Sequence, residues 1–79
     1  MSTHKISNVP LKDFKVFLTK AGCEYAGTVG GHEKWKKQGL SRPIIIQTHV
    51  NPIPERIIKE SLKNLNLTKQ DLFDIIFLK

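Results

Sequence analysis

The side chains best suited to acid–base chemistry in this sequence are its three histidines, His4, His32 and His49. An imidazole ordinarily titrates at about pH 6.5, so it can accept and release protons near neutral pH. His4 lies in a terminus that we expect to fray, which makes it the weakest candidate. His32 follows Gly30 and Gly31, which have no side chains to keep a bulky substrate away. His32 is therefore the best candidate for a catalytic base, although the residues alone favour the alternative, an ordinary surface histidine after a glycine turn.

Two lysines follow His32 at two-residue intervals. If residues 32–37 form a regular strand, alternation divides their side chains between two faces. One face then has His32, Lys34 and Lys36, and the other has Glu33, Trp35 and Lys37. We assign the Trp35 face to the core, although an exposed tryptophan between lysines could instead stack on a nucleic-acid base. The solvent face then offers a proton acceptor beside two cations.

The remaining chemical groups are less informative. His49 is an auxiliary candidate, because it would approach His32 if the second and third strands pair; otherwise it is a turn residue. Cys23 follows the helix-terminating Gly22 and is interpreted as a packed residue rather than a nucleophile. The sequence contains no Cys/His cluster with zinc spacing, no HExxH pattern and no GxxxxGK[ST] or GxGxxG loop. We therefore predict neither a metal site nor a cofactor.

The overall charge favours a polyanionic partner. The 79 residues have a net charge of +6 and an isoelectric point near 9.7. Residues 1–50 hold 8 Lys and Arg against 3 Asp and Glu, whereas residues 51–79 hold 5 against 4. Basic side chains that bind phosphates release counterions, and a net positive charge steers the protein toward a polyanion. A surface whose charge only keeps the protein soluble explains the composition equally well.

The chain is expected to be a soluble cytoplasmic protein. Its single cysteine cannot form an internal disulfide, and its first residues lack the charged-then-apolar pattern of a secretion signal. Its apolar runs are far shorter than the ~18 residues that indicate a membrane span, so no membrane association is predicted.

Apolar periodicity and glycine or proline breaks divide the chain into six expected elements. Helices are expected from Pro10 to Ala21, from Glu55 to Leu65 and from Thr68 to about Leu78. Strands are expected from Cys23 to Ala26, from His32 to Lys37 and from Pro43 to Thr48, with residues 27–31 as a connection. The order predicts a single α+β domain over residues 1–79, in which helices cover one face of a three-stranded antiparallel sheet.

The first helix has an apolar stripe of Leu11, Phe14, Phe17 and Leu18. Ser7 or Asn8 can cap it, and Pro10 suits its first turn. Its three lysines, Lys12, Lys15 and Lys20, are expected to lie mostly off the stripe and in water.

This combination of motifs resembles the HicA (YcfA-like) family of toxin–antitoxin ribonucleases. The resemblance covers about residues 8–76. Its motifs are a lysine-bearing helix ending in Ala21-Gly22, the turn Gly30-Gly31-His32, Glu33-Lys34-Trp35, Arg42-Pro43-Ile44, Gln47-Thr48-His49 and a proline-led helix. Two features depart from the family pattern: Gly31 stands where serine is commoner, and Thr68 to Lys79 extends beyond the end of many members.

The resemblance implies a fold similar to the double-stranded RNA-binding domain, a catalytic histidine at His32, metal-independent cleavage of messenger RNA, and neutralisation by a HicB-type antitoxin. Lys34 and Lys36 are then expected to hold RNA phosphates, while Gly30 and Gly31 admit the RNA backbone. Two alternatives remain open. One is a non-catalytic RNA-binding module of the same fold, and the other is an interaction protein that recognises an acidic partner.

Overall fold

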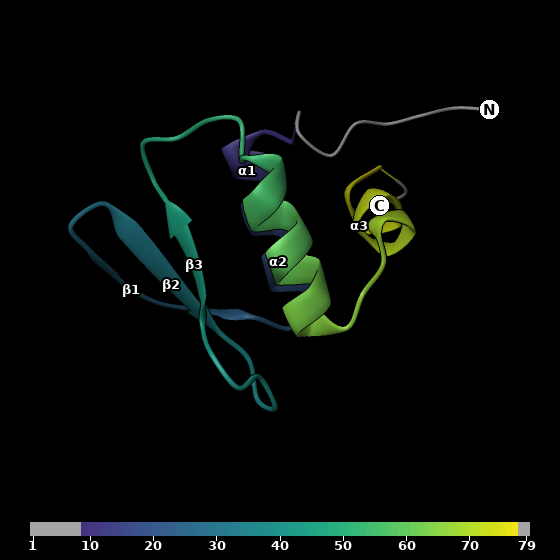
Figure 1. Ribbon diagram of the computed structural model, residues 1–79, viewed down its shortest axis with the longest axis horizontal. Coiled ribbons are helices and arrows are strands. Elements are labelled where there is room, and N and C mark those ends of the chain that lie inside the picture. The colour runs from purple at the N-terminus through teal and green to yellow at the C-terminus, as the bar shows by residue number, and fades with distance from the viewer. Residues whose placement is uncertain (1–8, 78–79) are drawn as a thin grey trace.

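The computed structural model describes residues 9–77, which fold into a small sheet with helices on one side (Figure 1). The elements are α1 (Leu11–Lys20), β1 (Glu24–Val29), β2 (His32–Lys36), β3 (Ile44–Gln47), α2 (Glu55–Leu65) and α3 (Lys69–Phe77). The strands form an antiparallel sheet in the order β1-β2-β3. The helices α1 and α2 lie beside one face of the sheet, and α3 packs on their far side (Figure 1). The expected α+β fold with the order α-β-β-β-α-α is confirmed.

The first strand and its turn differ from the sequence prediction. β1 continues through Gly27, Thr28 and Val29, which we had expected to be a loop. An irregularity between Tyr25 and Gly27 shifts the register, and Gly27 adopts a φ of 127°, so the strand bends and then resumes pairing. Only Gly30 and Gly31 form the turn to β2, with φ values of 57° and 80°. Positive φ at both positions is what a tight type I′ hairpin requires.

The start of α1 depends on a residue distant in sequence. The backbone N–H of Leu11 donates to Oδ1 of Asn51 at 2.9 Å, which supplies the acceptor that an N-terminal cap normally provides. The predicted caps Ser7 and Asn8 lie outside the described residues. The loop before α2 therefore fastens the beginning of α1.

The expected junction between α2 and α3 is present. Asn66 ends α2 in the left-handed conformation with φ of 60°, and the N–H of Leu67 donates to the carbonyl of Leu62. Thr68 and Asp71 then form reciprocal hydrogen bonds, each side chain accepting from the other residue's backbone N–H, at 3.1 and 2.9 Å. Within residues 9–77, none of the helices is long and apolar enough to cross a membrane.

One cluster of buried side chains joins the sheet to the three helices. It contains Phe14, Phe17 and Leu18 of α1, Trp35, Ile44 and Ile46 of the sheet, Ile58, Leu62 and Leu65 of α2, and Leu72 and Ile76 of α3, with Val9, Cys23 and Ile53 between elements. The predicted core positions of Cys23 and Trp35 are confirmed. Burial raises the pKa of the Cys23 thiol, and the charge of Lys37 opposes this only in part, so the thiol is unsuited to act as a nucleophile.

Candidate functional site

The strand β2 presents His32 on the outer face of the sheet, which we define as the face turned away from α1 and α2. His32, Lys34 and Lys36 are exposed, whereas Glu33 and Trp35 between them are buried. The predicted division into two faces is confirmed. Within the described part of the chain, neither Lys34 nor Lys36 forms an ion pair. Glu24 of β1 lies opposite Lys36, so Lys34 is the less compensated cation.

The ring of His32 has two hydrogen-bond contacts. Its Nδ1 lies 3.1 Å from the carbonyl oxygen of Gly30, and its Nε2 lies 3.5 Å from the amide nitrogen of Gln47. A carbonyl oxygen can only accept, so Nδ1 carries the proton when the ring is neutral. Nε2 then has a free lone pair, to which the Gln47 amide N–H donates. Because 3.5 Å is long for a hydrogen bond, a substrate hydroxyl can replace this weak contact.

We expect the neutral ring of His32 to be the Nδ1–H tautomer in solution, because the Gly30 carbonyl selects it. Long-range ¹H–¹⁵N NMR spectra, recorded at a pH where the ring is uncharged, distinguish the two tautomers. His49 is an internal comparison, since within residues 9–77 its ring has no hydrogen-bond partner to fix it. A spectrum that shows the proton on Nε2 of His32 would contradict the hydrogen bond from Nδ1 to the Gly30 carbonyl.

Gln47 is the site residue that sequence reasoning missed. It lies opposite His32 in the β2–β3 register, whereas His49 lies beyond the end of β3. Within the described residues, no hydrogen bond joins His49 to His32. Its ring instead lies beside Gly31, where a Cβ on that glycine would come 3.5 Å from Nδ1. Pairing of the two strands was expected, but only their register shows that Gln47 meets His32.

The turn before His32 is held by Thr48. The backbone N–H and the hydroxyl of Thr48 both donate to the carbonyl oxygen of Gly31, at 2.8 and 3.1 Å. The space around Gly31 would admit a Cβ at ordinary contact distances, but its φ of 80° is strained for any residue with a side chain. Glycine at position 31 therefore fits this two-glycine turn.

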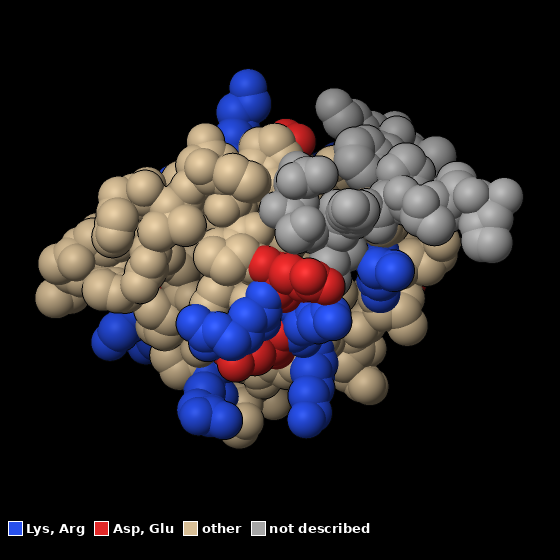
Figure 2. All heavy atoms as spheres, turned by 45° about the horizontal axis from the view of Figure 1, so that its top comes forward, with Lys and Arg blue, Asp and Glu red and all other residues tan. Residues whose placement is uncertain are grey.

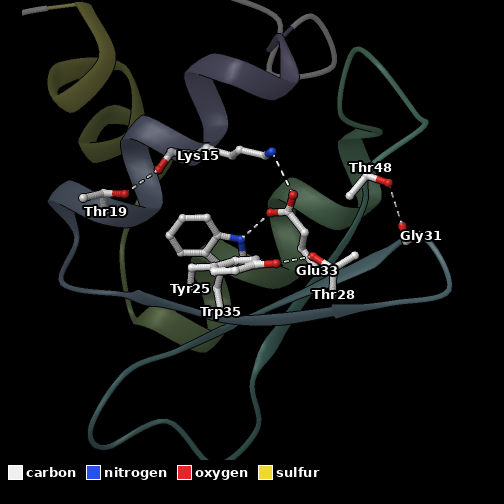
Figure 3. Close-up of polar contacts among 8 residues, drawn as sticks. All are labelled: Lys15, Thr19, Tyr25, Thr28, Gly31, Glu33, Trp35 and Thr48. Atoms are coloured by element: carbon white, nitrogen blue, oxygen red, sulfur yellow. Dashed lines mark hydrogen bonds and ion pairs between the residues drawn. The ribbon is translucent and has the colours of Figure 1, made fainter.

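On the buried face of β2, the carboxylate of Glu33 joins this strand to α1 (Figure 3). Glu33 accepts from Trp35 Nε1 at 3.0 Å and pairs with Lys15 Nζ at 2.8 Å. Burial alone would raise the pKa of Glu33, but the hydrogen bonds from Lys15 and Trp35 and the charge of Lys15 outweigh it, so the pKa is lowered. Lys15, which we expect in water, is only partly exposed, because its long side chain reaches from α1 to this carboxylate on β2.

Charges on α2 are largely compensated. Arg56 pairs with Glu60 at 3.5 Å and Lys59 with Glu55 at 3.2 Å, each one helical turn apart. Figure 2 shows this mixture, with acidic and basic side chains side by side over α2. The uncompensated positive charge near His32 therefore comes from the sheet rather than from the first turns of α2.

Within residues 9–77, no three His, Cys, Asp or Glu side chains lie close enough together to hold a metal ion. Comparisons of the chain with protein-family models, with curated proteins and with solved structures find no match. The geometry around His32 is therefore the basis for assigning a function.

Proposed function

We propose that this protein is an RNA-cleaving enzyme of the HicA toxin type, with His32 as its general base. The observation that carries the proposal is the exposed ring of His32, whose Nδ1 is held by the Gly30 carbonyl and whose Nε2 has only the long 3.5 Å contact with the Gln47 amide. The resemblance of the Gly30-Gly31-His32 motif and its surroundings to that family supports it. Messenger RNA is the proposed substrate, and a HicB-type antitoxin that covers His32 is the proposed inhibitor.

In the proposed reaction, Nε2 of His32 takes the proton from a ribose 2′-hydroxyl. The 2′-oxygen forms a bond to the adjacent phosphorus, the bond from phosphorus to the 5′-oxygen breaks, and that oxygen takes up a proton from solvent. The products are a 2′,3′-cyclic phosphate and a 5′-hydroxyl. The Gly30 carbonyl keeps its hydrogen bond to Nδ1 throughout, so it stabilises the imidazolium that forms.

Lys34 and Lys36 are the proposed phosphate-binding groups beside His32. They follow it at two-residue intervals on the same face, which places successive Cα atoms roughly 7 Å apart. Cations positioned there stabilise the negative charge that develops on the phosphate as the 2′-oxygen attacks. Gly30 and Gly31 add no side chains that would obstruct the RNA backbone.

The proposal predicts a specific pattern of cleavage. Purified protein should cut single-stranded RNA and leave 2′,3′-cyclic phosphate ends, and EDTA should not reduce the rate. A matched oligonucleotide with 2′-deoxyribose at the scissile position should bind but not be cut, because it lacks the nucleophile. Gel analysis of the labelled products, with mass spectrometry of their ends, tests both points.

Two outcomes would contradict the proposal. Normal cleavage at the deoxy position would remove the 2′-hydroxyl from the mechanism. Binding of all the RNAs without any cleavage would instead indicate the non-catalytic RNA-binding module.

A further inference from the structure

An open groove leads away from His32 along the free edge of β3. It has a volume of about 800 Å³ and is lined by residues of β3, of the loop before it and of α2. In Figure 1 these two elements lie side by side with their long axes roughly aligned. His32 and Gln47 line one end of this β3–α2 groove, Arg42 and Lys63 line the other, and Ile45 and Glu60 lie between.

The groove has an uncompensated positive charge at its far end. Within residues 9–77, neither Arg42 nor Lys63 forms an ion pair. The acidic group in the groove, Glu60, already lies 3.5 Å from Arg56. Asn64 donates from its side chain to the Arg42 carbonyl at 3.2 Å, which holds the loop before β3 against α2. The two cations are thus attached to a fixed part of the fold.

The edge of β3 is poorly suited to pairing with a protein strand. In an antiparallel pair, every second residue directs its backbone N–H and C=O groups toward the partner strand. Because the Thr48 N–H donates to the Gly31 carbonyl, Ile45 and Gln47 are residues whose backbone groups point away from β2, toward the free edge. Pro43 has no N–H, and the Gln47 carbonyl already accepts from Val50. Few backbone groups therefore remain for an added strand.

Single-stranded RNA fits the same surface better. The exposed side chain of Ile45, together with Pro43, gives the groove an apolar side that unstacked bases can contact. A duplex presents mainly its phosphates and ribose hydroxyls, and would leave these apolar groups without a partner. Cations that track the backbone beside surfaces that contact bases are the usual combination in proteins that bind single strands.

We infer that the RNA strand cleaved at His32 continues, as a single strand, along the β3–α2 groove to phosphate contacts at Arg42 and Lys63. This inference rests on the proposed function, since it takes His32 as the point of cleavage. It extends the RNA-binding surface beyond Lys34 and Lys36, around the edge of the sheet.

The test compares variants that remove equal charge, all made in a His32→Ala background so that RNA is not consumed. The groove variant is Arg42→Gln with Lys63→Gln. Its matched control is Lys12→Gln with Lys69→Gln, two exposed cations that do not line the groove and have no ion pairs within the described residues. We expect the groove variant to bind single-stranded RNA on the order of tenfold more weakly. The slope of log affinity against log salt should become shallower by about 0.7 for each phosphate that the variant no longer binds.

Two further measurements sharpen the result. Glu60→Gln removes a negative charge from the groove and should strengthen binding of the single strand. Binding of an RNA duplex should be reduced no more by the groove variant than by the control. Circular dichroism establishes that each variant is folded.

Equal salt slopes for the groove variant and its control would overturn the inference, as would an equal loss of duplex binding and single-strand binding in the groove variant. Neither result affects cleavage by the unaltered protein, so the proposed function would stand. If the unaltered protein does not cleave RNA but the groove variant still binds the single strand more weakly than its control, the proposed reaction fails and the binding path is supported.

Discussion

Replacing His32 with alanine should lower the rate of RNA cleavage by about 10²- to 10⁴-fold, the usual contribution of a positioned general base. This corresponds to roughly 3 to 5 kcal/mol of activation free energy. The fold should be unaffected, because His32 is exposed and contributes no side chain to the core. RNA binding should survive, since the cations proposed to hold phosphates remain. Cleavage rates at saturating protein and binding by fluorescence anisotropy measure the two effects separately.

His49→Ala is the comparison for this variant. It removes the same side chain at the same end of the sheet, but within the described residues no hydrogen bond joins the ring of His49 to His32. We expect a far smaller reduction of activity than for His32→Ala. Full activity in His32→Ala would refute the mechanism, and an equally large reduction in His49→Ala would make His49 a partner in the reaction.

Replacing Glu33 with alanine should lower the free energy of unfolding by about 3 kcal/mol. The change leaves the buried indole N–H of Trp35 without its acceptor and Lys15 without its partner. Such a decrease is a large part of the roughly 5 to 15 kcal/mol that stabilises a small domain. Lys15→Met should cost only about 1 kcal/mol, because the Lys15 side chain is 36% exposed and the indole keeps its acceptor. Urea denaturation followed by tryptophan fluorescence measures both.

The contribution of Glu33 should also depend on pH. Its pKa is lower in the folded protein than its ordinary value of 4.5, so the folded state favours the ionised carboxylate. The resulting stabilisation is fully present above that ordinary value and is lost as the pH falls through the lowered one. The stability difference between the unaltered protein and Glu33→Gln should therefore shrink on acidification below about pH 4.5. A difference that stays constant down to about pH 2 would show that the charge of Glu33 does not stabilise the fold.

Much of the architecture follows from local sequence patterns. Apolar residues at helical spacing define α1, as Phe14, Phe17 and Leu18 show, and the range predicted for α2 agrees with the structure. Alternation along β2 was enough to place Trp35 in the core and His32 in solvent. These features depend on the period of each element, which neighbouring residues alone determine.

The sequence predictions differ from the structure where one local pattern is compatible with two conformations. Gly27 is predicted to lie in the connection between two strands because glycines favour a turn there, but the conformational freedom of glycine also allows an irregularity within β1. Lys15 is predicted to lie in water because it is off the apolar stripe of α1, whereas its flexible side chain also reaches a buried acceptor on β2. The local sequence does not distinguish the two conformations, since each depends on contacts with residues that are distant in the sequence.

The sequence by itself determined the strand that bears His32, the face on which that histidine lies and the glycines of the turn before it. The tertiary structure alone decided that Gln47 meets the Nε2 of His32, that Asn51 caps α1, and that Arg42 and Lys63 line one groove with His32. The reason is physical: the two hydrogen bonds join residues 15 and 40 positions apart, and the groove brings together side chains of β2, of β3 with the loop before it, and of α2. Such arrangements are fixed by strand register and helix packing, which the pattern of neighbouring residues does not encode.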